Sequence, residues 1–171
     1  MKPSSRAQPA PRTPLYTAEE RRRRDATHWT LVQGILAPVQ FLVFLMSLGL
    51  VLRFLASGQG QSIASASVVL KTVLLYAIMI TGSFWEKAVF GRYLFAHPFF
   101  WEDMVSMLVL ALHTLYLLAL FTGWLSVREQ MFLALAAYSS YAVNATQFLL
   151  KLRAARRDAP PAEDARRALA A

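Results

Sequence analysis

The chain contains no cysteine and only three histidines among its 171 residues. Without cysteine, a disulfide, a thiolate nucleophile and a cysteine-ligated metal are all excluded. The histidines His28, His97 and His113 are too few for a typical haem-transfer enzyme or dinuclear metal site. The chain also lacks a glycine-rich phosphate loop, a nucleophile elbow and a His-x-x-x-His pair. We therefore expect no protein-bound metal.

Acidic residues are scarce: 10 aspartates and glutamates stand against 18 lysines and arginines, which gives a formal net charge of +8. Of the basic residues, 7 precede Trp29 and 6 lie from Lys151 onward. This distribution is typical of membrane topology and of attraction to anionic lipid. No recognition motif for DNA or RNA accompanies the charge, so we expect no nucleic-acid partner.

Apolar residues make up 56% of the chain, more than a soluble domain of this length could bury in one core. Four consecutive arginines at 21–24 are followed almost directly by an uncharged stretch over 26–52. A basic block before an apolar run of more than about 20 residues predicts a membrane helix whose start is held in the cytoplasm. The run is too long for a secretory signal peptide and lacks its small-residue cleavage site.

Four membrane spans are predicted, at about 29–52, 67–85, 104–124 and 131–150. An even number of spans places both termini on one side, and 15 of the 18 basic residues then face the cytoplasm. The sequence thus predicts an all-α, polytopic membrane protein, a bundle of four transmembrane helices with both termini cytoplasmic.

The segments outside the spans differ in composition. Residues 1–14, rich in proline, serine and arginine, and residues 157–171 are predicted to be disordered tails, which leaves one transmembrane domain over 15–156. Thr17 and Glu20 have the spacing of a capping box, which predicts a short helix ahead of the first span.

Polar side chains inside the spans must face protein, water or a ligand, because lipid does not solvate them. Several of them share a helix face: Ser140, Asn144, Gln147 and Lys151 on the fourth span, Gln33 and Gln40 on the first, and Glu102, Ser106, His113 and Tyr116, with Val109, on the third. The simplest interpretation is that the amides hold the helices together by hydrogen bonds. Asn144 and Gln147 are alternatively contacts to a substrate. Lys71, on the second span, is predicted to extend to the outer interface.

Chemically useful side chains are densest between the second and third spans, over 85–103. Three carboxylates, Glu86, Glu102 and Asp103, stand there beside His97 and a run of aromatic residues. An aromatic belt at the membrane interface would account for the tryptophans and the tyrosine. It accounts less well for the carboxylates, which can act as acids next to aromatic groups at a membrane surface. Pro98 is predicted to start the third helix.

Five strings lie between Leu15 and Arg156, a range that takes in most of the chain: LYTAEERRRRDATHWTLVQG at 15–34, GSFWEKAVFG at 82–91, FFWED at 99–103, LALHT at 110–114 and QFLLKLRAAR at 147–156. They resemble the vinyl bacteriochlorophyllide hydratases. The resemblance implies an integral enzyme of the inner or intracytoplasmic membrane of a photosynthetic bacterium, acting in bacteriochlorophyll biosynthesis. It implies addition of water to the C3 vinyl group of a chlorophyllide, which gives a 1-hydroxyethyl group.

This reaction needs a proton on the terminal vinyl carbon and a water at the inner carbon, where the cation is conjugated with the macrocycle. We expect Glu86, Glu102 or Asp103 to give the proton, and a second carboxylate or His113 to take a proton from the water. No cofactor is needed, and the magnesium belongs to the pigment.

Pigment binding would involve a second set of residues. Lys87 or Arg92 is expected to pair with the propionate carboxylate, and His97, His113 or a water to ligate the pigment magnesium. The flat ring is expected to stack on aromatic side chains, namely Trp85, Tyr93, Phe99, Phe100 and Trp101. Expected partners are the chlorophyllide substrate, membrane lipid and other enzymes of the same biosynthesis.

Two other classes of function stay open. A pigment carrier or assembly factor would use the same aromatic surface without an acid. A small four-helix transporter would need a membrane-embedded acid, but the carboxylates here stand only at the ends of spans. The polar faces of the first and fourth spans are compatible with a closed monomer and with a homo-oligomer.

Overall fold

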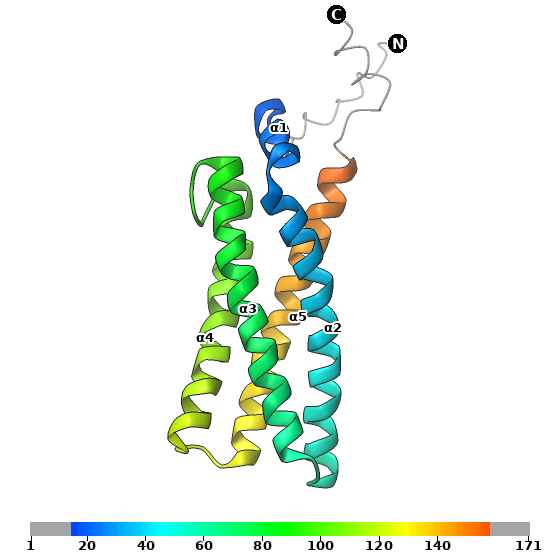
Figure 1. Cartoon of the computed structure of the whole chain (residues 1–171), viewed down its shortest axis with the longest axis vertical. Helices are drawn as coiled ribbons and strands as arrows, with labels where there is room; N and C mark the ends of the chain where they lie inside the picture. The colour runs from blue at the N-terminus through cyan, green and yellow to red at the C-terminus, as the bar shows by residue number, and fades with distance from the viewer. Residues whose placement is uncertain (1–14, 158–171) are drawn as a thin grey trace, which may run out of the picture.

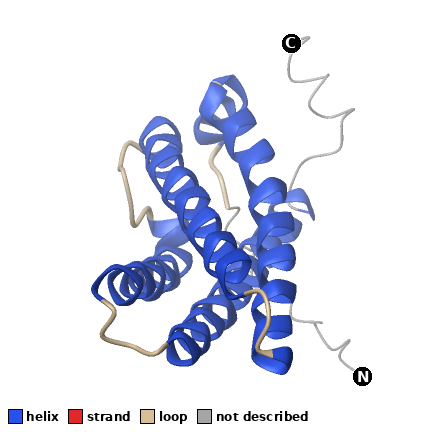
Figure 2. Ribbon diagram, turned by 60° about the horizontal axis from the view of Figure 1, so that its bottom comes forward, coloured by secondary structure: helices blue, strands red, loops and turns tan. Residues whose placement is uncertain are grey.

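The computed structural model describes residues 15–157, and these are folded almost entirely into helices (Figures 1 and 2). In chain order the elements are α1 (Ala18–Ala26), α2 (His28–Ser57), α3 (Gln61–Phe90), the 3-10 helix η1 (His97–Phe99), α4 (Phe100–Thr122) and α5 (Val127–Arg157). The all-α prediction is confirmed. Residues 1–14 and 158–171, which account for nearly all of the two predicted tails, lie outside the described part of the chain.

The four long helices form a bundle of two antiparallel hairpins, α2–α3 and α4–α5, which pack side by side. Helix α1, the end of α5 and the α3–α4 connection lie together at one end of the bundle, which we call the terminal end (Figure 1). The two short turns of the hairpins lie at the other end, which we call the turn end and which Figure 2 brings toward the viewer.

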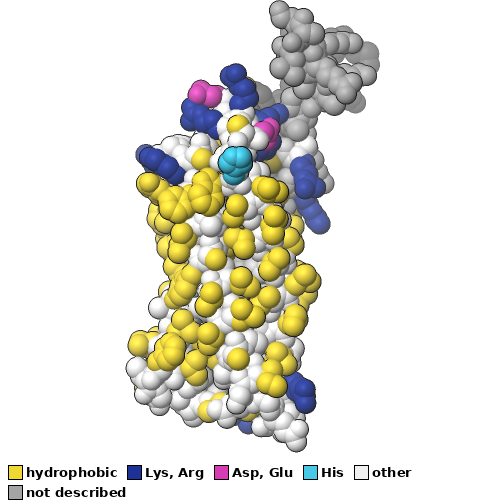
Figure 3. Space-filling view, in the orientation of Figure 1, with side chains coloured by type: hydrophobic (Ala, Val, Ile, Leu, Met, Phe, Trp, Pro, Cys, Tyr) yellow, Lys and Arg dark blue, Asp and Glu magenta, His cyan; other side chains and the backbone are white. Residues whose placement is uncertain are grey.

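Three helical segments, His28–Ser57, Gln61–Phe90 and His97–Thr122, are long and apolar enough to cross a membrane. The predicted fourth span, 131–150, is helical throughout and lies within α5. Large apolar side chains cover the outside of the bundle, and lysines and arginines gather mostly at the terminal end (Figure 3). An exposed apolar surface of this extent is unusual for a soluble monomer and suits contact with lipid.

The capping box predicted ahead of the first span is present at the start of α1. The side chain of Thr17 accepts a hydrogen bond from the N–H of Glu20 at 3.2 Å, and the Glu20 carboxylate accepts one from the N–H of Thr17 at 2.8 Å. The hydroxyl of Thr27 then caps α2 by accepting from the N–H of Trp29. These caps separate α1 from the first long helix.

Inside the bundle, the polar face predicted for the third span is confirmed: Glu102, Ser106, Val109, His113 and Tyr116 are all buried on α4. The face is buried because residues three and four apart share one side of a helix, and this side packs against α5. Buried polar groups are therefore part of the bundle core, alongside apolar residues.

The prediction that Lys71 extends to the outer interface is wrong. Its side chain is fully buried, and the ammonium nitrogen lies 3.7 Å from the centroid of the Tyr141 ring. Lys71 is ten residues into α3, which begins at Gln61. It is thus roughly 15 Å from the turn end, at 1.5 Å per residue, on the side of the helix that faces the core.

Gly123 ends α4 in the left-handed region, with φ of 69°, and its N–H bonds the carbonyl of Ala119. Because a Cβ disfavours this conformation, we expect Gly123→Ala to lower the free energy of unfolding by about 1 kcal/mol. Gly49→Ala, inside α2 with open space around the added Cβ, should leave stability unchanged or slightly raised. Equilibrium unfolding in detergent micelles measures the stability of both variants. Equal destabilisation of the two would contradict a left-handed conformation at Gly123.

Candidate active site

The three candidate carboxylates lie at the terminal end, where α3 ends and α4 begins. Glu86 stands in the last turns of α3, and Glu102 and Asp103 stand in the first turn of α4. Their exposed fractions are 5%, 7% and 4%, so all three are buried. Pro98 lies in η1, directly before α4, and thus stands near the helix start as predicted.

Glu86 and Asp103 form a pair. Burial raises the pKa of the Glu86 carboxyl, and the neighbouring charge of Asp103 raises it further; burial also raises the pKa of Asp103. Two adjacent buried carboxylates would repel each other strongly. The raised pKa values therefore favour a proton on one of the two carboxyl groups.

The same pair fixes the connection between α3 and α4. Oε2 of Glu86 accepts a hydrogen bond from the N–H of Ala96 at 3.1 Å, and Oδ2 of Asp103 accepts one from the N–H of Phe95 at 2.7 Å. Phe95 has φ of 59° and is the only non-glycine residue with positive φ in the part of the chain described here. An unfavourable backbone conformation persists only where its surroundings impose it, and here the two carboxyl groups do so.

Glu102 has different partners. Its Oε2 lies 2.6 Å from Nζ of Lys151, which also donates to the carbonyl of Pro98. The amide of Asn144 donates to the carbonyl of Glu102 at 2.9 Å and to the hydroxyl of Ser106 at 3.1 Å. These contacts join the start of α4 to α5, and they occupy the amide of Asn144 in helix packing.

The aromatic residues predicted to stack on a substrate separate into two groups. Trp85 and Phe99 belong to a packed cluster at the terminal end, where Phe99 is 2% exposed. Tyr93, Phe100 and Trp101 are 54%, 42% and 71% exposed. Tyr93, Phe100 and Trp101 can therefore contact a flat ligand directly. Trp85 and Phe99 instead pack inside the protein at the terminal end.

Sequence reasoning missed Tyr16 and Thr30 as parts of this support. The ring of Tyr16, 4% exposed, stacks on Phe90 with centroids 5.8 Å apart. The hydroxyl of Thr30 accepts a hydrogen bond from the indole N–H of Trp85 at 3.0 Å. Both residues lie in the string 15–34 that resembles the hydratases, and that likeness is the one signal that could have indicated them.

The predicted polar contacts Lys87, Arg92 and His97 are exposed at the terminal end. The ammonium of Lys87 donates to the carbonyl of Gly91 at 2.9 Å and lies 5.2 Å from the ring centroid of Tyr93. A basic group therefore stands beside one of the three exposed aromatic rings.

The structure does not bring His113 together with the carboxylates. It follows Asp103 by ten residues on α4, which is about 15 Å along the helix axis. The imidazole is fully buried, and its Nδ1 is hydrogen-bonded to the carbonyl of Val109 at 2.8 Å. Its enclosure leaves no space for a macrocycle at this position.

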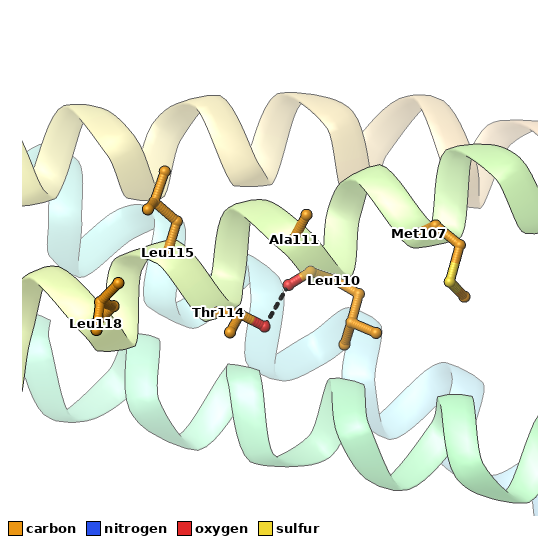
Figure 4. Close-up of a pocket in the computed structure, with 6 residues that line it drawn as sticks. All are labelled: Met107, Leu110, Ala111, Thr114, Leu115 and Leu118. Atoms are coloured by element: carbon orange, nitrogen blue, oxygen red, sulfur yellow. Dashed lines mark hydrogen bonds between the residues drawn. The ribbon is translucent and has the colours of Figure 1, made fainter.

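Two apolar grooves lie on the outer faces of the bundle, away from the carboxylates. The larger, of about 400 Å³, is on α4 (Figure 4) and is lined by Met107, Leu110, Ala111, Thr114, Leu115 and Leu118. The hydroxyl of Thr114 is satisfied by the carbonyl of Leu110, so the groove offers apolar contacts. The second, of about 360 Å³, is on α5 and includes Gln147. Both suit lipid better than catalysis.

Comparison with known proteins settles the family. Residues 16–154 match the model of the 2-vinyl bacteriochlorophyllide hydratase family. The chain belongs to this family. A 2-vinyl bacteriochlorophyllide hydratase from Cereibacter sphaeroides is 62% identical over 163 residues, which cover 95% of this chain and 100% of that protein. Another from Rhodobacter capsulatus is 61% identical over 163 residues, which cover 95% of this chain and 94% of that protein. No solved structure matches the chain.

The matched range, 16–154, spans the carboxyl pair, the ion pair and the exposed aromatic residues. Membership of a hydratase family favours an enzyme over the pigment carrier and the transporter considered from the sequence. Within residues 15–157, no three histidine, aspartate or glutamate side chains are grouped so that they could hold a metal ion.

Proposed function

We propose that this protein adds water to the C3 vinyl group of a chlorophyllide or bacteriochlorophyllide and forms the 3-(1-hydroxyethyl) pigment. The observation that supports the mechanism is the buried, neighbouring pair Glu86 and Asp103, whose carboxyl pKa values are raised by burial, next to a connection that bears exposed aromatic rings. We propose that this pair holds one proton. The reaction is inferred from membership of the hydratase family. The carboxyl pair is the proposed acid for this reaction.

The carboxyl pair can supply both proton transfers. In the first step it gives its proton to the terminal vinyl carbon, and a cation forms on the inner carbon in conjugation with the macrocycle. Water then adds to the inner carbon, and its surplus proton passes to the pair, which returns to its starting state. Nothing is oxidised or reduced, so the reaction requires no redox cofactor, and the magnesium remains part of the substrate.

Glu102 and His113 fit other roles better than proton transfer. Glu102 is engaged by the ammonium of Lys151, which holds α5 against the start of α4 and so positions Asp103. His113 lies about 15 Å along α4 from Asp103, too far to act on the same water. The second carboxyl group of the pair replaces it as the base.

The pigment is proposed to approach from the leaflet at the terminal end. Its macrocycle would lie against Tyr93, Phe100 and Trp101, with Lys87 or Arg92 on the propionate and His97 as the candidate magnesium ligand. The connection 91–96 covers the carboxyl pair, so it must shift for the vinyl group to reach the proton. Two N–H bonds to the pair hold it there, and this shift would have to break them.

Trp101→Ala is expected to weaken pigment binding about 2- to 10-fold, because an aromatic stacking partner contributes roughly 0.5–1.5 kcal/mol. Trp124→Ala is the matched control, since Trp124 is similarly exposed at 57% but lies at the turn end. Fluorescence titration with a vinyl chlorophyllide measures both affinities. Equal affinities for the two variants would place the pigment elsewhere.

We further propose that all four helices span the inner or intracytoplasmic membrane of the bacterium, with the terminal end in the cytoplasm. The apolar lengths of α2, α3 and α4 and the basic residues at the terminal end support this orientation. The chain has no cysteine, so single cysteines can be introduced. In intact spheroplasts, an impermeant maleimide should label Gln59→Cys and should label Ala18→Cys only after lysis. The opposite pattern would invert the topology.

Turnover tests the function itself. Membranes containing the protein are supplied with a 3-vinyl chlorophyllide and no added cofactor, and the absorption spectrum and product mass are followed. A blue shift with a gain of one water is expected. Pigment that binds but stays unchanged, while the Cereibacter sphaeroides hydratase is active in the same assay, would overturn the proposal and favour a carrier.

A further inference from the structure

The centre of the bundle contains a second group of polar side chains, which the proposed reaction does not use. Lys71 on α3 and His113 and Tyr116 on α4 are each 0% exposed. Lys71 and His113 pack against two tyrosines one turn apart on α5: Nζ of Lys71 lies 3.7 Å from the ring centroid of Tyr141, and the rings of His113 and Tyr138 are 5.8 Å apart. Tyr116 follows His113 by three residues on α4. The group lies well inside the bundle, away from the carboxyl pair.

Some polar atoms of this group are satisfied within the protein. The hydroxyls of Ser47 and Ser67 are hydrogen-bonded at 2.7 Å, and the Ser47 hydroxyl also bonds that of Tyr138. Three atoms lack a hydrogen-bond partner of good geometry within residues 15–157: Nζ of Lys71, Nε2 of His113 and the hydroxyl of Tyr116, which has the Ser65 side chain beside it. Buried polar groups in proteins are almost always paired, with ordered water where no protein group serves.

The three unpartnered atoms have complementary requirements. A carbonyl oxygen only accepts, so Nδ1 of His113 carries the hydrogen that bonds Val109, and Nε2 of the neutral ring is left as an acceptor. The ammonium of Lys71 only donates, and the hydroxyl of Tyr116 does both. A ligand for all three must therefore donate as well as accept. A chloride or carboxylate could accept from Lys71, but it could not donate to His113.

No acidic side chain of the four long helices lies at this polar group in the centre of the bundle. The acidic residues of α3, α4 and α5 are Glu86, Glu102, Asp103 and Glu129, which all stand near the ends of the bundle, and α2 has none. Toward the turn end the group is closed by small apolar residues, Val51, Ala64, Ala119 and Ala134, each 0% exposed. The group is thus enclosed by the protein, and no chain of polar side chains continues from it to the turn end through these residues.

We propose that ordered water occupies the centre of the bundle and bridges Lys71, His113 and Tyr116. Water is the small molecule that can donate to Nε2 of His113 while accepting from Lys71 and Tyr116. This internal hydration site does not depend on the proposed hydratase function, and it accounts for a lysine and a histidine in the core of a membrane protein.

Water-edited solid-state NMR of the labelled protein in bilayers tests the site. Magnetisation from water is expected to reach the side chains of His113 and Tyr116 much faster than the methyl groups of Val51, which is equally buried in an apolar setting. In the Tyr116→Phe variant, which removes one hydroxyl only, transfer to His113 should decrease while the remaining spectrum is preserved. Transfer to His113 as slow as transfer to Val51 in the wild-type protein would overturn the proposal.

A second measurement separates water from an anion. The signals of His113 and Lys71 are compared in buffers that contain chloride or sulfate as the only added anion. We expect no change, because water occupies the site in both buffers. A shift of both signals that depends on chloride would overturn the proposal and assign the site to an anion.

Discussion

Replacing Glu86 with glutamine is expected to lower turnover of the vinyl pigment by about 10²- to 10⁴-fold, the range that a positioned general acid contributes. The glutamine carbonyl can still accept from the N–H of Ala96, as Oε2 of Glu86 does, so the connection stays anchored. The pair, however, loses the proton that it transfers. Initial rates from absorption and product mass measure the effect, and fluorescence quenching measures pigment binding separately.

Asp103→Asn is expected to act in the same way, and the double variant should be no worse than either single one, because residues that act as a unit are not additive. Glu129→Gln is the matched control, since Glu129 is exposed at the turn end and bonds only Ser126 among the described residues. Full activity in both single variants would exclude the pair as the acid. Loss of pigment binding would instead indicate that the pair serves only to hold the connection.

Lys151→Met is expected to lower the free energy of unfolding by about 3–5 kcal/mol, because it leaves the buried carboxylate of Glu102 without its counter-charge. The Glu102 side chain is 9% exposed and lies 2.6 Å from Nζ of Lys151. Equilibrium unfolding in mixed micelles measures the loss. The double variant Glu102→Gln with Lys151→Met should recover much of the stability, since it removes the uncompensated charge.

Lys87→Met provides the comparison for this ion pair. Lys87 is an exposed lysine at the same end of the bundle and donates to a backbone carbonyl. Its replacement should change stability by less than about 0.5 kcal/mol, as is usual for surface substitutions. If Lys151→Met changed the free energy of unfolding as little as Lys87→Met, the contact between α4 and α5 would not depend on the ion pair Glu102–Lys151.

The elements of the fold could be predicted because their signals are local. The arginine block before the first span, the capping box at Thr17 and the glycines that end helices all act over a few residues. The predicted span 29–52 lies inside α2, and 67–85 lies inside α3. The helices extend beyond the spans because the hydropathy of a segment reports the thickness of the lipid, whereas hydrogen bonding sets the helix ends.

The site was predicted less completely because its contacts depend on how the helices rotate and meet. Glu86 and Asp103 are far apart in sequence and become a pair only through the fold of the intervening connection. Phe99 and Phe100 are adjacent aromatic residues, yet one is buried and the other exposed. The sequence placed Lys71 in the second span, but it did not indicate whether its side of the helix met lipid or the core.

The turn end of the bundle consists of only two short connections, 58–60 and 123–126. In the proposed topology it therefore offers almost no protein surface to a partner on that side of the membrane. Exchange of pigment with neighbouring enzymes would be one-sided: it would take place at the terminal end or sideways through the lipid. The described part of the chain begins and ends at the terminal end, the same end as the carboxyl pair. In the proposed topology, consecutive enzymes could therefore be linked there without the pigment crossing the bilayer.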